Sequence, residues 1–390
     1  MAEHFDVVIV GGGIHGVGVA QAAACAGYSV LLLEQVALAS GTSSRSSKLA
    51  HGGLRYLEGF DFHLVRESLV ERDILLRNAP ELVRLQPFHI PVYPDTTRRP
   101  LILRAGLTLY ALLDGFGRAS RFGTLPRRDW DTLDGLDTAR LQAVFRYHDG
   151  QTNDVDLTRA VMQSAIEYGA TLACPAEFTA AVVTPAGCEI SYRVDGVEQH
   201  CMARVLVNAG GPWVDTIDAR ISPRPAPVAA DLVQGAHLVM QEPVRAGCYY
   251  VESPHDRRAI FLLPWGEHAL LGTTESSYRG DPRDVQVHAE EEAYLLDVQQ
   301  HYFPQRSTQV VERFAGLRVL PAEGGAAFSR SRETHLVVDN VHTPRTLSIY
   351  GGKLTVYRAT AEKVMHTLRS VLPERRAIAR TAELALTPVD

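Results

Sequence analysis

Lysine is scarce in this sequence. Only Lys48, Lys353 and Lys363 occur among 39 basic residues, so arginine supplies nearly all of the positive charge. The lysine ammonium is a compact point charge that can also transfer a proton, so a lysine retained in such a chain indicates a specific need. Lys48 and Lys353 are therefore candidate functional residues, although an ordinary surface charge fits Lys48 equally well.

The chain also lacks a net positive charge. The formal net charge of −6 at pH 7 argues against nucleic-acid binding, because affinity for a phosphate backbone requires clustered Lys and Arg. The five cysteines are scattered, odd in number and free of CxxC pairs, and no secretory signal precedes them. This pattern predicts reduced thiols in a cytoplasmic protein, and no metal site.

The longest uncharged stretch is not a membrane span. No charged residue occurs from Val7 to Leu33, a length that could cross a bilayer. However, six glycines and His15 interrupt it, and an alanine-rich segment lies between two β-branched runs. A buried strand–helix–strand unit explains this composition better.

That unit has the order of a dinucleotide-binding motif. The apolar run at 6–10 predicts a central parallel strand, and Gly11-x-Gly13-x-x-Gly16 follows it directly. A helix should then run to about residue 26, and 28–33 should form a second strand. The sequence therefore predicts a βαβ unit with a glycine-rich turn after its first strand.

Each glycine of the motif has a physical role. Gly11 permits a tight turn, Gly13 allows the backbone to approach a pyrophosphate, and Gly16 allows close helix–strand packing. The pyrophosphate would lie on the helix N-terminus. Glu34 closes the second strand, 23 residues after Gly11, where its carboxylate can accept hydrogen bonds from both ribose hydroxyls of an adenosine.

The segment that follows separates NAD from FAD. Residues 40–58 combine small hydroxyl side chains, a His51-Gly-Gly turn, and then Arg55 and Tyr56. Such a stretch can follow an extended cofactor closely, and its small side chains leave room for a flat ring.

Five motifs, in order along nearly the whole chain, resemble FAD-dependent glycerol-3-phosphate dehydrogenases. They are Thr42-Ser-Ser-x-Ser-Ser-Lys-Leu-x-His-Gly-Gly-Leu-Arg-Tyr-Leu-Glu58, Asn208-Ala-Gly-Gly-Pro-Trp213, Gly272-Thr-Thr-Glu-Ser-Ser-Tyr-Arg-Gly-Asp-Pro282, Gly316-Leu-Arg-Val-Leu-Pro321 and Tyr350-Gly-Gly-Lys-Leu-Thr-Val-Tyr-Arg358. The resemblance implies flavin-dependent oxidation of sn-glycerol 3-phosphate to dihydroxyacetone phosphate. A hydride would pass from C2 to N5 of FAD, and the electrons would go to quinone or oxygen.

The resemblance also implies an α/β fold in which a Rossmann-like FAD-binding domain, of the glutathione-reductase and D-amino-acid-oxidase type, is interleaved with a substrate domain built on a mixed or antiparallel sheet. We expect 1–80, 145–225 and 325–390 to form the discontinuous FAD-binding domain, and 81–144 and 226–324 to form the substrate domain. The remaining patterns predict helices at 61–79, from Asp156 to Gly169 and at 355–368, and strands at 178–202, 204–208, 332–339 and 347–350.

The motifs supply candidate cofactor-binding residues from four parts of the chain. They are Gly11, Gly13, Ile14, Gly16, Glu34, Thr42, Ser43, Ser44, Ser47, Lys48, Leu49, Gly210, Trp213, Gly352, Lys353, Leu354 and Thr355.

A phosphorylated alcohol requires cationic partners and a base. The resemblance places Arg55, Tyr56, Arg318, Arg332 and Lys353 around the substrate, because arginine forks and a lysine suit a phosphate monoester. His51 and His237 are the candidate bases for the hydroxyl proton, since histidine titrates near neutral pH. Arg318 would stabilise the developing oxyanion, and Lys353 completes the candidate catalytic set.

The segment from Arg84 to Arg128 is basic, with eight arginines and two acids among aliphatic and aromatic residues. It could lie on an anionic bilayer, or it could be a helix buried on one face with arginines on the solvated side. The resemblance favours peripheral membrane contact, since the family typically passes electrons to quinone.

Several positions depart from the family pattern. His15 replaces an Asn and should be tolerated if its ring points away from the pyrophosphate loop. Ala236, Glu275 and Val356 replace Ser, Asp and Thr, and we expect these changes to alter the substrate pocket. The resemblance also implies a short form of the family, without the helical C-terminal domain of its longer members. The alternatives are another phosphorylated or carboxylated hydroxy compound as substrate, and a non-catalytic flavin-binding module; an amino-acid oxidase would not need so many cationic residues.

Overall fold

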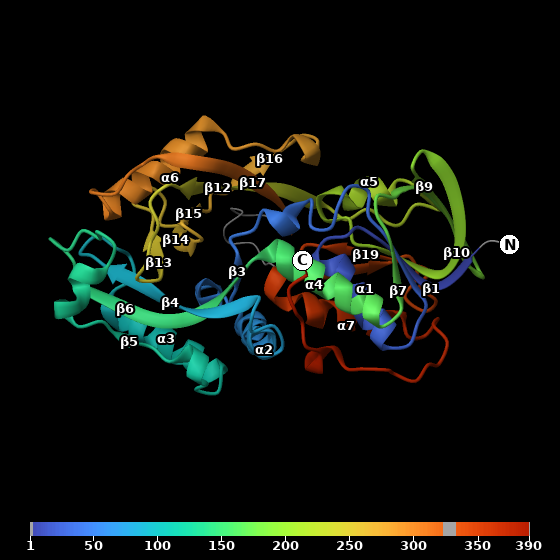
Figure 1. Ribbon diagram of the computed structural model, residues 1–390, viewed down its shortest axis with the longest axis horizontal. Coiled ribbons are helices and arrows are strands. Elements are labelled where there is room, and N and C mark those ends of the chain that lie inside the picture. The colour runs from blue at the N-terminus through green and yellow to red at the C-terminus, as the bar shows by residue number, and fades with distance from the viewer. Residues whose placement is uncertain (1–2, 323–332, 390) are drawn as a thin grey trace.

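The computed structural model describes residues 3–322 and 333–389, and within these ranges two sheets organise the chain (Figure 1). The first sheet has nine strands: β1 (Glu3–Val10), β2 (Val30–Leu33), β7 (Ala170–Ala173), β8 (Glu177–Thr184), β9 (Gly187–Val194), β10 (Val197–Asn208), β11 (Ile221–Ser222), β18 (His335–Val338) and β19 (Thr346–Tyr350). Its centre is parallel, since β1 pairs with β2 and β10, β2 with β7, and β10 with β19.

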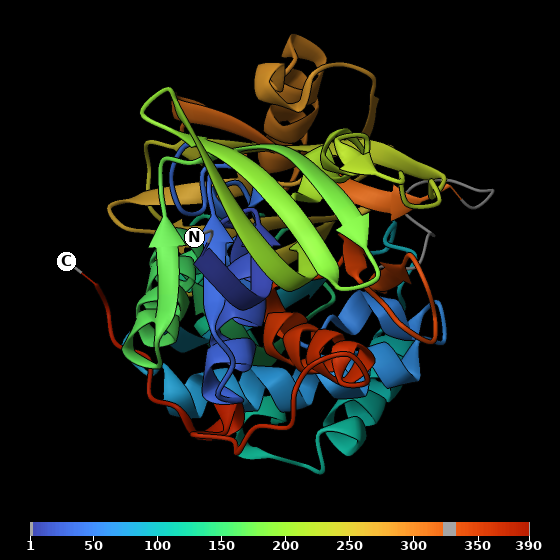
Figure 2. The ribbon, with the colours of Figure 1, turned by 90° about the vertical axis from the view of Figure 1, so that its right-hand side faces the viewer.

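Both faces of this parallel centre are buried. In β1, Val7 and Ile9 face helices α1 (Ile14–Cys25), α4 (Asp154–Glu167) and α7 (Tyr357–Leu368), whereas Val8 and Val10 face the antiparallel strands β8 to β10. Figure 2 shows the green antiparallel strands on one side and the red helix α7 on the other. A strand with two buried faces must be apolar at successive positions, which explains the run at 6–10.

The second sheet is mixed and has ten strands: β3 (Leu49–Ala50), β4 (Val83–Val92), β5 (Gly123–Thr124), β6 (Ala143–Thr152), β12 (Ala230–Met240), β13 (Cys248–Glu252), β14 (Ala259–Trp265), β15 (His268–Gly272), β16 (Ser276–Tyr278) and β17 (Val310–Pro321). Helix α6 (Ala289–Tyr302) packs on one face, and α2 (Phe62–Asn78) and α3 (Pro100–Leu113) pack on the other. The short helix α5 (Val214–Asp218) follows β10. The expected fold class is confirmed.

Some expected boundaries were wrong. Helix α4 begins at Asp154 and is capped by the Asn153 side chain, which accepts from the backbone N–H of Val155 and Asp156, so Asp156 lies inside the first turn. The strands expected at 178–202 and 204–208 do not divide there, because β10 is continuous from Val197 to Asn208. Strand β18 begins at His335, later than expected.

The division into two domains stays a prediction. Strand β6 belongs to the second sheet, so a boundary based on the sheets would fall near 152 rather than 145. In the part of the chain that the structure describes, no helix combines the length and apolar composition that crossing a membrane requires.

Candidate active site

A cavity of about 900 Å³ lies at the carboxyl ends of four neighbouring parallel strands. The segments that follow β1, β2, β10 and β19 form one wall, and β12, β17 and the segment after β15 form the opposite wall. Ligands of open α/β sheets bind at this edge. The candidate cofactor-binding residues that line the cavity are Gly11, Gly13, Ile14, Glu34, Thr42, Ser43, Ser47, Leu49, Gly210, Trp213, Gly352, Lys353, Leu354 and Thr355.

The glycine-rich turn after β1 has the geometry that the motif predicts. Gly11 has φ +111°, and a Cβ there would lie 2.6 Å from the carbonyl oxygen of Ala209. A Cβ on Gly16 would lie 1.9 Å from the carbonyl oxygen of Gly11, so Gly16 serves packing and does not line the cavity. The N-terminus of α1 borders the cavity, where its partial positive charge suits a pyrophosphate.

Glu34 is held in place by backbone donors. Its carboxylate accepts from the backbone N–H of Gly12 (2.7 Å) and of Val36 (2.8 Å), and the residue is 9% exposed. A carboxylate has about four acceptor sites, so capacity remains for ribose hydroxyls. With this acid beyond the glycine turn, and with Thr42, Ser43 and Ser47 lining the same cavity, the residues present fit FAD.

Lys48 and Ser44 do not line this cavity. The Lys48 ammonium donates to the Ser44 carbonyl (2.5 Å) and forms an ion pair with Asp154 (Nζ–Oδ1, 2.6 Å), and both side chains are buried. The interpretation of Lys48 as a surface charge was wrong, and its predicted cofactor contact is not supported by its position. Asp154, which sequence reasoning missed, also accepts from the backbone N–H and hydroxyl of Ser46.

The His51 turn is fixed to the start of the segment that leads into α7. The backbone N–H of His51 donates to Thr355 Oγ1 (3.0 Å), and the Thr355 hydroxyl donates to the His51 carbonyl (3.3 Å). His51 lines the cavity, and the next N–H, of Gly52, donates to Asp149 (3.2 Å).

His237 lines the same cavity on β12. Its Nε2 lies 2.9 Å from Ser47 Oγ, and its ring stacks on Phe314 with centroids 5.0 Å apart. Burial lowers the pKa of His237 to about 3, and the positive charges of Arg318 and Lys48 act in the same direction. The ring is therefore neutral at physiological pH.

Three of the four predicted cationic side chains meet at the cavity. The Arg55 guanidinium lies over the Tyr56 ring, 4.9 Å from its centroid, and donates to its hydroxyl (3.3 Å). The Lys353 ammonium lies 3.6 Å from the centroid of the same ring. Arg318 lines the cavity from β17, whereas Arg332 lies outside the described residues.

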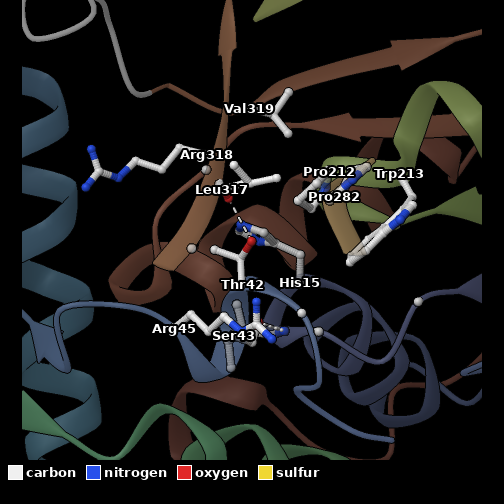
Figure 3. A pocket seen from close by; sticks show the side chains of 18 of the residues that line it. His15, Thr42, Ser43, Arg45, Pro212, Trp213, Pro282, Leu317, Arg318 and Val319 are labelled. Carbon is white, nitrogen blue, oxygen red and sulfur yellow. Dashed lines mark hydrogen bonds between the residues drawn. The ribbon is translucent and has the colours of Figure 1, made fainter. Parts of the chain in front are cut away.

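The Arg318 fork is oriented by its neighbours on the second sheet. It donates to Glu275 (Nη1–Oε1, 2.7 Å) and to Thr273 Oγ1 (3.2 Å). Figure 3 shows Arg318 and Trp213 on opposite sides of the pocket, with His15 and Thr42 between them. The sequence marked Glu275 as a departure from the family pattern but gave no signal for this contact.

His15 does not meet the condition under which the sequence analysis expected it to be tolerated, because it does not point away from the site. It lines the cavity, and a Cβ on Gly352 would lie 2.3 Å from its Nε2. Burial lowers the pKa of His15 to about 4, so the ring faces the cavity in its neutral form.

Comparison with known proteins agrees with this geometry. Residues 6–358 match the family of FAD dependent oxidoreductases. Glycerol-3-phosphate dehydrogenase of Pseudomonas aeruginosa is 37% identical over 95% of this chain and 72% of its own length. This chain belongs to the FAD-dependent glycerol-3-phosphate dehydrogenase family. It is an oxidoreductase with FAD as its cofactor, as the motifs predicted. D-erythritol 1-phosphate dehydrogenase of Brucella abortus is 35% identical over 95% of this chain and 75% of its own length.

Solved structures agree on the fold. Glycerol-3-phosphate dehydrogenase from Bacillus halodurans, complexed with FAD, superposes with a TM-score of 0.77 at 26% identity over 98% of this chain and 68% of that chain. Glycine oxidase from Geobacillus kaustophilus superposes with a TM-score of 0.71 at 18% identity over 99% of both chains. The second likeness bears on the fold alone.

Proposed function

We propose that this enzyme oxidises sn-glycerol 3-phosphate to dihydroxyacetone phosphate. The observation that carries the proposal is the meeting of Arg55, Arg318 and Lys353, from three distant parts of the chain, at the cavity that fits the flavin. A phosphate monoester is doubly charged near neutral pH, and several cationic donors match it better than they match a single carboxylate.

The residues have separate roles in this proposal. Arg55 and Lys353, which share the Tyr56 ring, bind the phosphate end of the substrate. Arg318 faces the reacting hydroxyl and stabilises the charge that develops on its oxygen. Bound FAD supplies the acceptor for the hydride that leaves C2.

His51 is the proposed base for the hydroxyl proton. Both candidate histidines line the cavity, but His237 has its Nε2 at Ser47 and a pKa near 3, which makes it a poor proton acceptor. His51 lies on a turn whose backbone is fixed by Thr355, so its position at the cavity is defined.

An anaerobic titration tests this assignment. Adding sn-glycerol 3-phosphate to the purified flavoprotein should bleach the flavin band, whereas glycerol, which lacks the phosphate, should not. The His51→Asn variant should bind substrate with a similar Kd but bleach about 100-fold or more slowly, while His237→Asn should slow bleaching much less. If amino acids bleach the flavin and no phosphorylated alcohol does, the proposal is wrong.

A longer polyol phosphate is the second candidate substrate. The similarity to an enzyme named for D-erythritol 1-phosphate favours it, because the same cationic side chains would hold either phosphate. Ala236 and Val356, which the sequence predicted to alter the pocket, are buried and do not line the cavity, so neither position distinguishes the two substrates. In a steady-state assay with an artificial electron acceptor, the ratio of kcat/KM for D-erythritol 1-phosphate and for sn-glycerol 3-phosphate separates the two candidates.

We further propose a cytoplasmic enzyme that docks on an anionic membrane through α3 and passes electrons to quinone. Apolar side chains are exposed on the outward face of α3 and on the turn that follows it. On the helix, Leu101 is 81% exposed, Ile102 61% and Leu112 56%, and Phe116 in the turn is 63% exposed. Basic side chains lie in the same segment, and apolar anchors combined with arginines suit an anionic bilayer surface.

Vesicle flotation tests the docking. The wild-type holoenzyme should float with vesicles that contain anionic lipid and less with neutral ones, and the double variant Leu101→Ser, Ile102→Ser should lose flotation. Val341→Ser is the matched control, because Val341 is 80% exposed but lies in the turn between β18 and β19. Equal flotation of all three proteins would contradict the docking surface, and reduction of oxygen but not of a soluble quinone would contradict the acceptor.

A further inference from the structure

A buried carboxylate that the chemistry above does not use lies behind the His51 turn. Asp149, on β6, is 1% exposed and lines no part of the cavity. It lies 97 residues from Gly52 in sequence, yet its Oδ1 accepts from the Gly52 backbone N–H at 3.2 Å. The contact joins the second sheet to the segment that carries the proposed base.

Both oxygens of the Asp149 carboxylate accept hydrogen bonds. Besides Gly52, its Oδ1 accepts from the backbone N–H of Gly150 (3.1 Å) and from Arg72 (3.5 Å), and its Oδ2 accepts from the Tyr110 hydroxyl (2.6 Å). Buried polar groups with this many partners have a single low-energy orientation. Asp149 is therefore a fixed point against which the turn is placed.

The turn fits closely against this fixed point. A Cβ on Gly52 would lie 2.3 Å from the Tyr110 hydroxyl oxygen and 2.4 Å from a Leu69 methyl carbon, so only glycine allows this approach. On its other side, Thr355 holds both backbone polar groups of His51. The turn is thus held between the segment that leads into α7 and the Asp149 carboxylate.

Arg72 connects Asp149 to two further carboxylates. Its fully buried guanidinium also donates to Asp114 (3.0 Å) and to Asp73 (2.8 Å). The Asp114 side chain is 3% exposed, and it has the same ion-pair partner as Asp149 but no contact with the turn among the described residues. The chain therefore offers a matched pair of carboxylates.

We propose that Asp149 is a positioning residue that sets the placement of His51 relative to the substrate hydroxyl. Proton transfer needs the base within hydrogen-bond reach, and a displacement of about 1 Å costs roughly 100-fold in rate. The proposal rests on the proposed function, because it takes His51 as the base.

Asp149→Asn and Asp114→Asn, both studied as holoenzymes, test the role. Both remove one carboxylate from Arg72, so both should lower the thermal midpoint. Only Asp149→Asn should lower kcat, by about tenfold or more, with little change in KM and with a shift of the flavin absorption bands. Equal losses of kcat in both variants, or no loss in Asp149→Asn, would overturn the proposal.

A second comparison separates positioning from general damage. In a His51→Asn background, Asp149→Asn should cause little further loss of kcat, because the base that it positions is already absent. Full additivity of the two losses would refute action through His51. If Asp149→Asn does not fold, Tyr110→Phe, which removes one donor to Asp149, should lower kcat several-fold at unchanged KM; an unchanged kcat would refute the proposal.

These experiments can show that the positioning role of Asp149 is wrong independently of whether the proposed substrate is correct. If another alcohol proves to be oxidised, the same kcat comparisons apply to that alcohol, and the band shift of the flavin needs no substrate. Loss of the substrate assignment with a retained difference between Asp149→Asn and Asp114→Asn would leave the positioning role intact.

Discussion

Replacing Lys48 with methionine should destabilise the fold and leave flavin affinity nearly unchanged. The Lys48 and Asp154 side chains are 5% and 0% exposed, and the charged atoms are 2.6 Å apart. Removing one partner of a buried pair leaves an uncompensated charge and costs about 3–5 kcal/mol. Ser46 still donates twice to Asp154, so we expect a value near the lower end, about 3 kcal/mol.

The measurement is a double-mutant cycle of Lys48→Met and Asp154→Asn, with urea unfolding followed at saturating FAD so that cofactor binding is constant. The double variant should be less destabilised than the sum of the single variants. Lys363→Met is the control, because its ammonium lies 2.6 Å from Glu67 but its side chain is 55% exposed, and such pairs contribute below about 1 kcal/mol. If Lys48→Met is no worse than Lys363→Met and FAD binding weakens about tenfold, the cofactor role predicted from sequence is correct and our reasoning is wrong.

Three further predictions follow from the site. Gly16→Ala should yield protein without flavin, measured as the ratio of flavin to protein absorbance, because the new Cβ would lie 1.9 Å from the Gly11 carbonyl oxygen. His237 has a pKa of 6.5 in the unfolded chain but of about 3 in the folded protein, so the unfolded state binds the proton more readily. The free energy of unfolding should therefore fall as the pH drops below about 6.5, by up to ~1.4 kcal/mol per pH unit. In urea unfolding at a series of pH values, His237→Asn should show a weaker dependence of this free energy on pH. Tyr56→Leu should raise KM for the phosphorylated substrate about tenfold more than Tyr56→Phe, which keeps the ring under the Lys353 ammonium; equal effects would show that the ring face does not matter.

The nucleotide half of the site could be predicted because its chemistry is local in sequence. Gly11, Gly16 and Glu34 lie within one βαβ unit, and the parallel sheet brings the ends of its strands to one edge. Short-range steric requirements, such as the positive φ of Gly11, leave a signature in a few adjacent residues. A reader of the sequence can therefore place this part without knowing the rest of the fold.

The buried contacts of Asp154 and Asp149, which hold the segments around the cavity in place, could not be predicted in the same way. Lys48 is 106 residues from Asp154, and Asp149 is 97 residues from Gly52. A single carboxylate, whether on a strand as in Asp149 or at the start of a helix as in Asp154, has no local pattern that distinguishes a buried ion-pair partner from a surface charge. The scarcity of lysine correctly marked Lys48 as special, but its function became visible only when β6 and the start of α4 were placed beside it.

Helix α3 shows why composition left two interpretations open. Its inward face buries Leu103, Leu107 and Tyr110, as expected for a helix packed on one side, and Tyr110 reaches Asp149 behind the proposed base. Its outward face nevertheless carries Leu101 and Ile102, which a helix that meets only water would not need. The inward face fits the interpretation of a helix packed on one side, and the outward face is the surface on which the proposed membrane docking depends. The outward substitutions should therefore abolish flotation while kcat with a soluble acceptor is unchanged. Tyr110→Phe should leave flotation unchanged and lower kcat several-fold.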